Sequence, residues 1–350
     1  MPPAKRVTHR DVARHAGVSP AVVSYVINNG PRATAPDTRE RVLQAIAELS
    51  YQPNASARGL RGQRTHTIGF IAHDYHPLDA FVSPYTANIL TGVAGELKDR
   101  NYYVLVYPMV IGEDPAGVHA LLHGARIDGV IVRLIEDSPA TDALLDVIAA
   151  ARIPCVCIER PGAARFGFSA VTYDDEGGAY AATNYLIARG QRRIGYLQGD
   201  LRYVAARNRL NGYKRALIEQ GVSVDDALIQ GQTWSSSDAA AATERLLHLP
   251  NPPTALFAAS DGLAFSAIEV LRERGIRVPD DVAVIGFDDT LVARDMRPSL
   301  TTVRIPLTAI GRLAANLVLR HIDAGDYHDG IGHDGIGTTL PVELVRRGTA

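Results

Sequence analysis

The first sixty residues contain two helical patterns separated by a tight turn, and this arrangement constrains the fold of the segment more than any other feature. Segments 8–18 and 19–29 each carry apolar residues at helical spacing, with Gly17 between them. Thr8 and Ser19 are suitable N-caps, and Pro20 fits a first helical position. One small core would take these apolar residues: Val12, Val18, Val23 and Ile27. The pattern predicts a helix-turn-helix.

A third helix is expected over 37–49, packed on the first two. The apolar residues at helical spacing in it are Val42, Leu43, Ile46 and Leu49. The segment 51–64 then carries small residues and arginines, and it is too short to hold a helix in isolation.

Charge divides unevenly along the chain. Residues 1–64 hold 10 Lys and Arg against 4 Asp and Glu, a balance of +6, and the remainder holds 26 against 34, a balance of −8. A charge run by itself is often only a solvated face. Together with the helix-turn-helix pattern, the basic segment favours contact with DNA phosphates.

The two cysteines of the sequence, Cys155 and Cys157, alternate in an apolar stretch and would face one side of a buried strand, where a disulfide between them is implausible. Neither a membrane-spanning run nor a signal segment is recognisable. We therefore expect a reduced cytoplasmic protein.

From residue 67 onward, short apolar strands alternate with helical segments, which is typical of parallel sheets with crossover helices. The expected strands are 67–72, 102–107, 129–132 and 153–158, then 193–197, 255–258 and 282–287. Two α/β lobes with a cleft between them follow. The pentapeptide His-Asp-Gly-Ile-Gly occurs twice, at 328–332 and 333–337. A metal site is conceivable there, but glycine-rich sequence favours a flexible inserted loop, and we expect no metal or cofactor.

Several ordered motifs resemble the lactose and galactose repressor (LacI/GalR) family over nearly the whole chain. They are Asp11-Val12-Ala13, Ala16-Gly17-Val18-Ser19, 38–42, Tyr51-Gln52-Pro53-Asn54, 209–213, Asp261, 278–282, 286–289, 300–303 and 340–345. The resemblance implies an α/β chain with three parts: a helix-turn-helix headpiece over 1–53, a hinge helix or linker over 54–64, and an effector-binding and dimerisation core over 65–350. The core is similar to periplasmic binding proteins, with a first lobe of about 65–170 and 304–335 and a second lobe of about 171–303 and 336–350.

The resemblance also implies which headpiece residues meet DNA. Base contacts map to Pro20, Ala21, Ser24 and Tyr25, and phosphate contacts to Thr8, Ser19, Ser24 and Asn28. Ala21 can contact a thymine methyl group, whereas a tyrosine at position 25 supplies no bidentate guanine contact. The alternative is a helix pair that binds another protein.

The hinge would place Leu60 between central base steps in the minor groove, with Ala57 allowing close approach and Arg58 near phosphates. Gly59 disfavours the helix, so the hinge is expected to fold only on DNA. A passive linker is the alternative.

In the cleft, the resemblance implies effector contacts from both lobes. The residues are His73, Asp74, Arg133 and Glu159 on the first lobe and Arg209, Trp234, Ser260 and Asp288 on the second. Arginines and carboxylates bind vicinal hydroxyls and an indole stacks on a sugar ring. Each residue also has a structural alternative: a core aromatic for Trp234, an ion pair for Arg209 and Asp288, a strand-end residue for His73. Arg133 with His73 could instead indicate an acidic effector.

The sequence lacks a phosphate-binding loop, a His-Glu-x-x-His motif and a nucleophile elbow, so no catalytic residues are expected. We expect a homodimeric, sequence-specific regulator, a repressor that binds a pseudo-palindromic operator and responds to a small metabolite, with a sugar as the expected class. A solute-binding protein and a sugar-modifying enzyme are the alternative classes.

Overall fold

The computed structural model describes residues 7–27, 34–51, 64–74, 83–124, 126–325 and 337–350. It forms two compact units, Met1–Thr65 and His66–Ala350. Among the described residues no helix is both long and apolar enough to span a bilayer.

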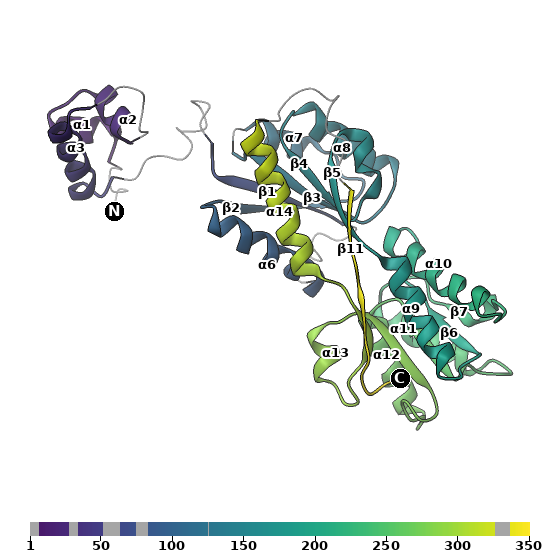
Figure 1. Ribbon diagram of the computed structural model, residues 1–350. Coiled ribbons are helices and arrows are strands. Elements are labelled where there is room, and N and C mark those ends of the chain that lie inside the picture. Colours follow the sequence, from purple (N-terminus) through teal and green to yellow (C-terminus); the bar gives the residue numbers. More distant parts are fainter. Residues whose placement is uncertain (1–6, 28–33, 52–63, 75–82, 125, 326–336) are drawn as a thin grey trace. The chain divides into compact units, whose positions relative to one another are not determined.

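The first unit is a three-helix cluster made of α1 (His9–Ala16), α2 (Pro20–Ile27) and α3 (Pro36–Glu48) (Figure 1). Thr8 caps α1 in a capping box with Asp11, and Gly17 ends α1 in the left-handed conformation at φ 66°. The helix-turn-helix prediction is confirmed. Its core consists of Val12, Ala13, Ala16, Val23, Val26, Val42 and Ala45, with Val18 and Ile27 packed at the edge.

One prediction for the third helix was wrong, because Leu43 is 47% exposed. Val42 and Ala45 take the buried places on α3, and Ile46 and Leu49 pack at the edge of the same core.

The second unit contains two six-stranded sheets, each with helices on its faces. The first has the order β11-β5-β4-β3-β1-β2 and the second the order β12-β10-β9-β8-β6-β7. The strands of the first sheet are β1 (Thr67–Asp74), β2 (Tyr103–Val110), β3 (Gly129–Leu134), β4 (Cys155–Ile158), β5 (Ser169–Tyr173) and β11 (Gly337–Leu340). Those of the second are β6 (Ile194–Leu197), β7 (Ile229–Gln230), β8 (Ala255–Ala258), β9 (Ala283–Asp288), β10 (Thr301–Arg304) and β12 (Glu343–Val345). Only the β10–β12 pair is antiparallel among these pairings.

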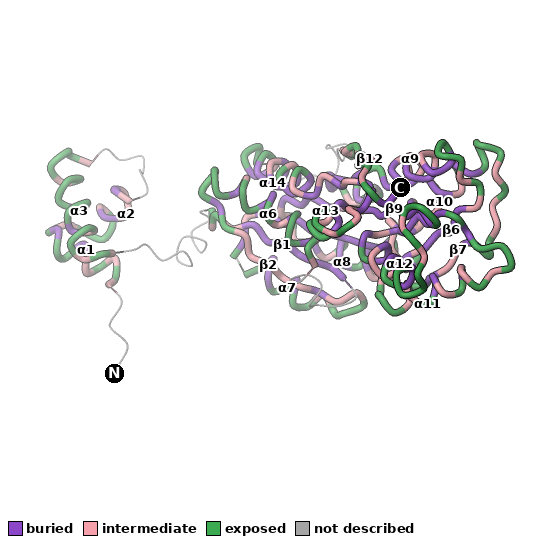
Figure 2. The backbone as a smooth tube through the Cα atoms, turned by 90° about the horizontal axis from the view of Figure 1, so that it is seen from below, coloured by how far each residue is buried: buried purple, intermediate pink, exposed green. Residues whose placement is uncertain are grey.

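Helices follow the strands as crossovers. Around the first sheet they are α6 (Pro84–Asp99), α7 (Ala116–His123), α8 (Pro139–Ala150) and α14 (Leu307–Ala324), with the 3-10 turn η1 (Pro161–Phe166). Around the second they are α9 (Asp175–Ala188), α10 (Val204–Glu219), α11 (Ser236–Leu247), α12 (Asp261–Glu273) and the short α13 (Leu291–Asp295), with the 3-10 turn η2 (Asp226–Leu228). In Figure 2 central strands such as β1 and β9 run through buried segments, whereas the helices carry buried and exposed residues in alternation. Two lobes built on parallel sheets are therefore confirmed.

The chain passes between the lobes at positions that differ from the expected ones. Val171 of β5 pairs with Ile158 of β4, and residues 170–173 of β5 pair with β11, so both segments belong to the first lobe. Arg304 pairs with Asp288 and belongs to the second lobe. The assignment of 171–173 and 336–340 to the second lobe was wrong, because strand pairing, which the sequence does not display, fixes the lobe of each segment. Most of the repeated pentapeptide lies outside the described residues.

Cys155 and Cys157 are free and buried on one face of β4, as the alternation predicts. Both pack in the cluster under α7 and α8, while Val156 and Ile158 pack in the large core on the opposite face.

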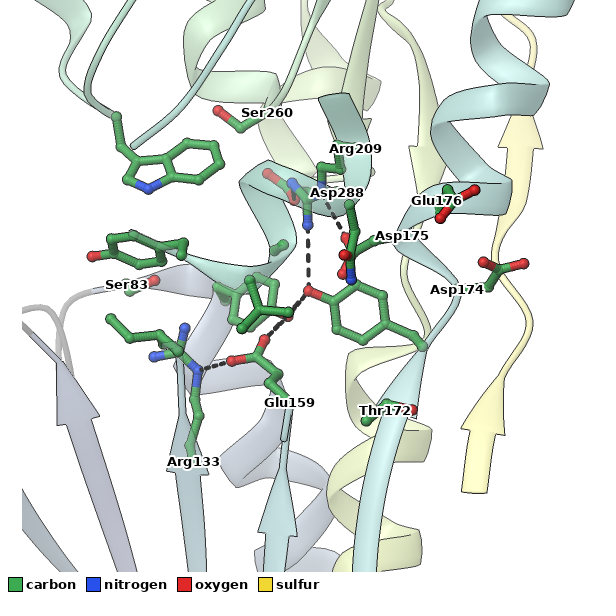
Figure 3. A pocket seen from close by; sticks show the side chains of 18 of the residues that line it. Ser83, Arg133, Glu159, Thr172, Asp174, Asp175, Glu176, Arg209, Ser260 and Asp288 are labelled. Atoms are coloured by element: carbon green, nitrogen blue, oxygen red, sulfur yellow. Dashed lines mark hydrogen bonds and ion pairs between the residues drawn. The ribbon is translucent and has the colours of Figure 1, made fainter. Parts of the chain in front are cut away.

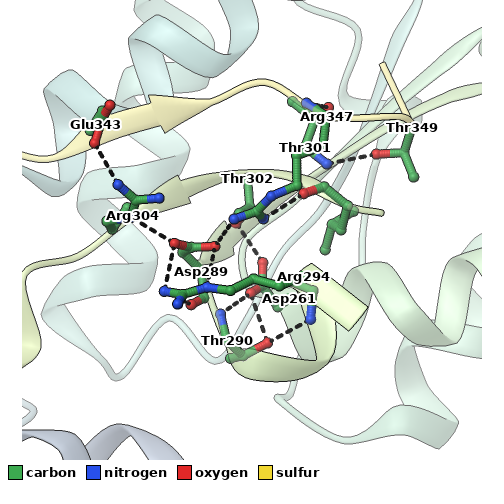
Figure 4. Close-up of polar contacts among 12 residues, drawn as sticks. Asp261, Asp289, Thr290, Arg294, Thr301, Thr302, Arg304, Glu343, Arg347 and Thr349 are labelled. Carbon is green, nitrogen blue, oxygen red and sulfur yellow. Dashed lines mark hydrogen bonds and ion pairs between the residues drawn. The ribbon is translucent and has the colours of Figure 1, made fainter. Parts of the chain in front are cut away.

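A buried ionic cluster ties the end of the chain to the second sheet (Figure 4). Asp289, whose side chain is 1% exposed, binds Arg294, Arg304 and Arg347. Next to it, Asp261 accepts hydrogen bonds from the Thr302 hydroxyl at 2.5 Å and from Thr290. These contacts join α12, α13, β10 and the C-terminal segment at the edge of the lobe.

Two helices of the first lobe, α6 and α14, meet through glycines and lie side by side in Figure 1. A Cβ at Gly92 would lie 2.0 Å from the carbonyl oxygen of Thr308, and a Cβ at Gly311 would lie 2.0 Å from that of Ile89. The backbones therefore approach too closely for any side chain.

We predict that Gly92→Ala destabilises the protein by about 1–3 kcal/mol, because a methyl group must push the α14 backbone away. Gly95→Ala in the same helix has no atom within 4 Å of its Cβ and is expected to stabilise by up to about 1 kcal/mol. Urea unfolding of both variants measures the difference, and equal midpoints would contradict the packing described for α6 and α14.

Candidate functional site

A cavity of about 500 Å³ lies in the cleft between the lobes. Its polar side chains come from the carboxyl ends of strands in both sheets and from the helices and loops that follow them. Asp74 ends β1, Glu159 follows β4, and Asp288 ends β9. This is the position at which open parallel sheets bind ligands.

Seven of the eight expected effector residues line the cavity. They are Asp74, Arg133, Glu159, Arg209, Trp234, Ser260 and Asp288. His73 does not line it: its side chain is buried in the first lobe, and burial lowers its pKa to about 4. Because β1 side chains alternate between faces, His73 and Asp74 point in opposite directions.

The first-lobe wall is organised around Arg133. Its Nη1 donates to Asp74 Oδ2 at 3.1 Å and its Nε lies 2.9 Å from Glu159 Oε2. The Tyr85 hydroxyl donates to Glu159, and it lies 2.6 Å from the Tyr173 hydroxyl. The guanidinium also stands over the Tyr85 ring at 5.0 Å. Arg133 is thereby held by two carboxylates and one aromatic face.

The second-lobe wall is organised around Arg209, which is 3% exposed (Figure 3). Its Nε donates to Asp175 Oδ1 at 2.7 Å, its Nη1 to the Ala259 carbonyl at 2.6 Å, and its Nη2 to the Tyr173 hydroxyl at 3.3 Å. Asp288 Oδ1 lies 3.5 Å from Nη1. The guanidinium also stands over the Phe287 ring at 3.9 Å, so Arg209 is held by two carboxylates, a carbonyl, a hydroxyl and one aromatic face.

Burial dominates the electrostatics of the acidic groups near Arg209. It raises the pKa of Asp288 to about 8 and that of Asp175 to about 7, although Arg209 opposes both shifts. Buried carboxylates in excess of the available cations therefore hold their protons more tightly than in water.

Ser260 and Trp234, the remaining predicted cavity residues, differ in whether their polar atoms are available to hydrogen-bond a ligand. Ser260 caps α12 by accepting from the Leu263 amide at 3.2 Å, so its oxygen is already used. Trp234 meets the Tyr203 ring edge-on at 5.6 Å, and among the described residues its buried Nε1 has no hydrogen-bond partner. A buried indole N–H in a cavity wall is a donor for a ligand oxygen.

Sequence reasoning missed several lining residues. These are Tyr85, Tyr173, Asp175, Tyr203 and Asn208. Asp175 and Asn208 could have been suspected from helix position, since one begins α9 and the other lies on α10 one residue from Arg209. The tyrosines gave no signal, because nothing in the local sequence separates a cleft tyrosine from a core tyrosine.

On the headpiece, the expected DNA contacts lie on the side of α2 away from its core. Ser19, Pro20 and Ala21 are exposed, and Ser24 and Tyr25 are partly exposed. The Ser19 hydroxyl accepts from the Val22 amide at 3.4 Å, and the Thr8 hydroxyl donates to Asp11 at 2.6 Å, so both side chains also serve as caps. Asn28, Ala57, Arg58 and Leu60 lie outside the described residues.

Comparison with known proteins agrees with a helix-turn-helix headpiece followed by a two-lobed core. Residues 8–54 match the model of bacterial regulatory proteins of the lacI family, and residues 183–350 match the periplasmic binding protein-like domain. The chain is 36% identical over 342 residues to the HTH-type transcriptional regulator CelR of Thermobifida fusca, covering 97% of this chain and 96% of the relative. It is 33% identical to the repressor PurR of Vibrio atlanticus (strain LGP32), covering 91% and 93%.

Solved structures are similar over the same length. A transcriptional regulator CelR–cellobiose complex matches with a TM-score of 0.73 at 33% identity, covering 99% of this chain and 100% of that one. The lac repressor dimer bound to operator and an anti-inducer matches with a TM-score of 0.84 at 26% identity, covering 99% of each chain.

A helix-turn-helix headpiece joined to a two-lobed core with a polar cleft defines the class of ligand-responsive transcriptional regulators. The chain belongs to the LacI family of bacterial regulatory proteins. These relatives are transcriptional regulators and repressors, not enzymes.

We predict that Asp288→Asn changes the pH dependence of stability. A carboxyl group with a raised folded-state pKa favours the folded state at low pH, and this contribution is lost as the pH rises from about 4 to about 8. The free energy of unfolding of the variant should therefore improve relative to the parent across that window. Urea unfolding at pH 5, 6.5 and 8 measures it, and a constant difference between parent and variant would contradict the shift.

Proposed function

We propose that this LacI-family regulator binds a pseudo-palindromic operator as a homodimer and represses transcription in the cytoplasm, under control of a sugar that binds in the inter-lobe cavity. The observation that carries the proposal is a polar cavity whose Trp234 indole N–H has no partner among the described residues. On the same chain, the headpiece exposes the first residues of α2, Pro20 and Ala21, to solvent.

The headpiece supports sequence-specific DNA contact. Pro20 and Ala21 are exposed at the start of α2, the part of a recognition helix that meets base edges. The basic charge of residues 1–64 adds attraction to phosphates. Base readout by this set would depend on the Ala21 methyl and the Tyr25 side chain rather than on an arginine.

The cavity supports a neutral, hydroxyl-rich effector. Six carboxylates and two guanidinium groups line it, and both arginines are already held by carboxylates. Both guanidinium groups are already ion-paired, so an anionic ligand would have to compete with the carboxylates of the protein for them. Sugar hydroxyls can donate to carboxylates, and the indole of Trp234 can face the apolar side of a ring. The alternative of an acidic effector is therefore disfavoured.

Two relatives provide the precedent. The CelR structure contains cellobiose, and the lac repressor was solved as a dimer on its operator. Dimerisation of this chain would match the two-fold symmetry of a palindromic site. Effector binding would change the angle between the lobes and thereby the separation of two headpieces.

We predict that selection from random duplexes by the full-length protein enriches one palindrome. Ala21→Asp should reduce affinity for it at least tenfold, because a carboxylate on α2 would meet base edges and phosphates. Ala47→Asp, an equal change on an exposed position of α3, is the control and should retain binding. Retained affinity in Ala21→Asp would place the DNA surface elsewhere.

We also predict that neutral sugars change the fluorescence of Trp234, the one tryptophan of the chain, whereas the corresponding sugar acids do not. Cellobiose is the first compound to titrate. Arg209→Lys should weaken the binding sugar at least tenfold, since lysine cannot reproduce three guanidinium contacts.

Arg272→Lys on the outer face of α12 is the matched control, because its partner is the exposed Glu269. Tighter binding of a sugar acid than of its neutral parent would overturn the sugar assignment.

A further inference from the structure

We propose that the Tyr203 hydroxyl and the Asp74 carboxylate form a latch between the two lobes, and that Tyr203 is a positioning residue that sets how readily the cleft opens to the effector. The role in effector response rests on the proposed function, whereas the latch itself does not.

The contact joins residues that belong to different sheets. Tyr203 precedes α10 in the second lobe, and Asp74 ends β1 in the first. The Tyr203 hydroxyl donates to Asp74 Oδ1 at 3.1 Å. Burial and the neighbouring Asp74 carboxylate raise the pKa of Tyr203, so the phenol stays protonated and can donate.

The backbone reinforces this contact at the same place. The Val204 amide donates to the Ile135 carbonyl at 3.0 Å, and Glu136 and Tyr203 form an isolated antiparallel bridge. Two chain segments far apart in the sequence, 135–136 and 203–204, thus pair across the cleft. This pairing is separate from the three crossovers, which follow Tyr173, Arg304 and Leu340.

Both partners are held in place on their own lobes. Arg133 binds the second oxygen of Asp74 at 3.1 Å. On the other side, Arg202 binds both oxygens of Asp200, and the Tyr203 amide donates to the Asp200 carbonyl at 3.0 Å. The latch therefore joins two pre-ordered elements, so little side-chain entropy is lost when it forms.

The latch is also part of the cavity wall. Asp74, Ile135, Tyr203 and Val204 all line the cavity, and the Tyr203 ring meets Trp234 edge-on. A ligand in the cavity would lie against the latch and would contact both lobes through it. The sequence predicted Asp74 only as an effector contact. In the structure it also forms a hydrogen bond between the two lobes.

The charged and titratable groups that face the latch are Asp74, Arg133, Glu136, Asp200 and Arg202. Arg133 and Arg202 neutralise Asp74 and Asp200 respectively. The Tyr203 hydroxyl is one of the donors that bind Asp74, and Tyr203→Phe removes this hydrogen bond to a buried carboxylate oxygen.

Hydrogen exchange tests the latch on the full-length protein without effector or DNA. The Val204 amide reports opening directly, because its acceptor lies on the other lobe. Tyr203→Phe is expected to accelerate its exchange about tenfold, the usual scale for a hydrogen bond to a charged group.

Tyr180→Phe is the matched control. It removes a phenol hydroxyl that donates to Glu219 at 2.6 Å, and both residues lie on helices of the second lobe, α9 and α10, outside the cavity lining. Its Val204 amide should exchange as in the parent. Amides of β8 in the second sheet should be unchanged in both variants, which separates cleft opening from loss of the fold.

Equal exchange of Val204 in Tyr203→Phe and the parent would overturn the latch, as would equal acceleration in Tyr180→Phe or a parallel acceleration at β8. With a binding sugar identified, Tyr203→Phe should change its association rate measured by Trp234 fluorescence. An altered Val204 exchange with no sugar response at all would leave the latch standing and remove the proposed effector.

Discussion

The buried guanidinium of Arg209 is the interaction on which the ligand-binding core depends. It contacts the Tyr173 hydroxyl of the first sheet, the Asp175 carboxylate that begins α9, and the Ala259 carbonyl that follows β8. A cation buried to this extent is stable only if carboxylates and carbonyls surround it. Because those groups come from both lobes, satisfying Arg209 also fixes the geometry of the cleft at its inner end.

The same requirement explains why the cavity is suited to hydroxyl groups. Arg133 and Arg209 are each paired with carboxylates of the protein. Trp234 adds an indole N–H that has no hydrogen-bond partner among the described residues. The proposed sugar effector rests on this combination of carboxylate acceptors and an available donor, which arises from the pairing of buried charges.

The secondary structure of the headpiece could be predicted from the sequence more completely than that of the core. The helix-turn-helix depends on contacts a few residues apart, such as the Thr8 cap and the Gly17 turn, and it was predictable in detail. The apolar strands of the core were equally clear, but β5 and β11 were not, because short half-polar segments become strands only when a neighbour pairs with them. The motifs placed seven of the eight effector residues on one cavity, whereas the tyrosines between the arginines were unexpected.

The sequence by itself determined the local elements, the reduced buried cysteines, the charge difference between headpiece and core, and the identity of the main cleft residues. These properties depend on spacing and side-chain chemistry along one stretch of chain. Only the tertiary structure decided which lobe receives each crossing segment, that His73 turns away from the cavity, and that Tyr203 meets Asp74 from the other lobe. Those outcomes depend on strand pairing and on the approach of two lobes, which bring together residues of different elements, such as Tyr203 and Asp74, 129 positions apart.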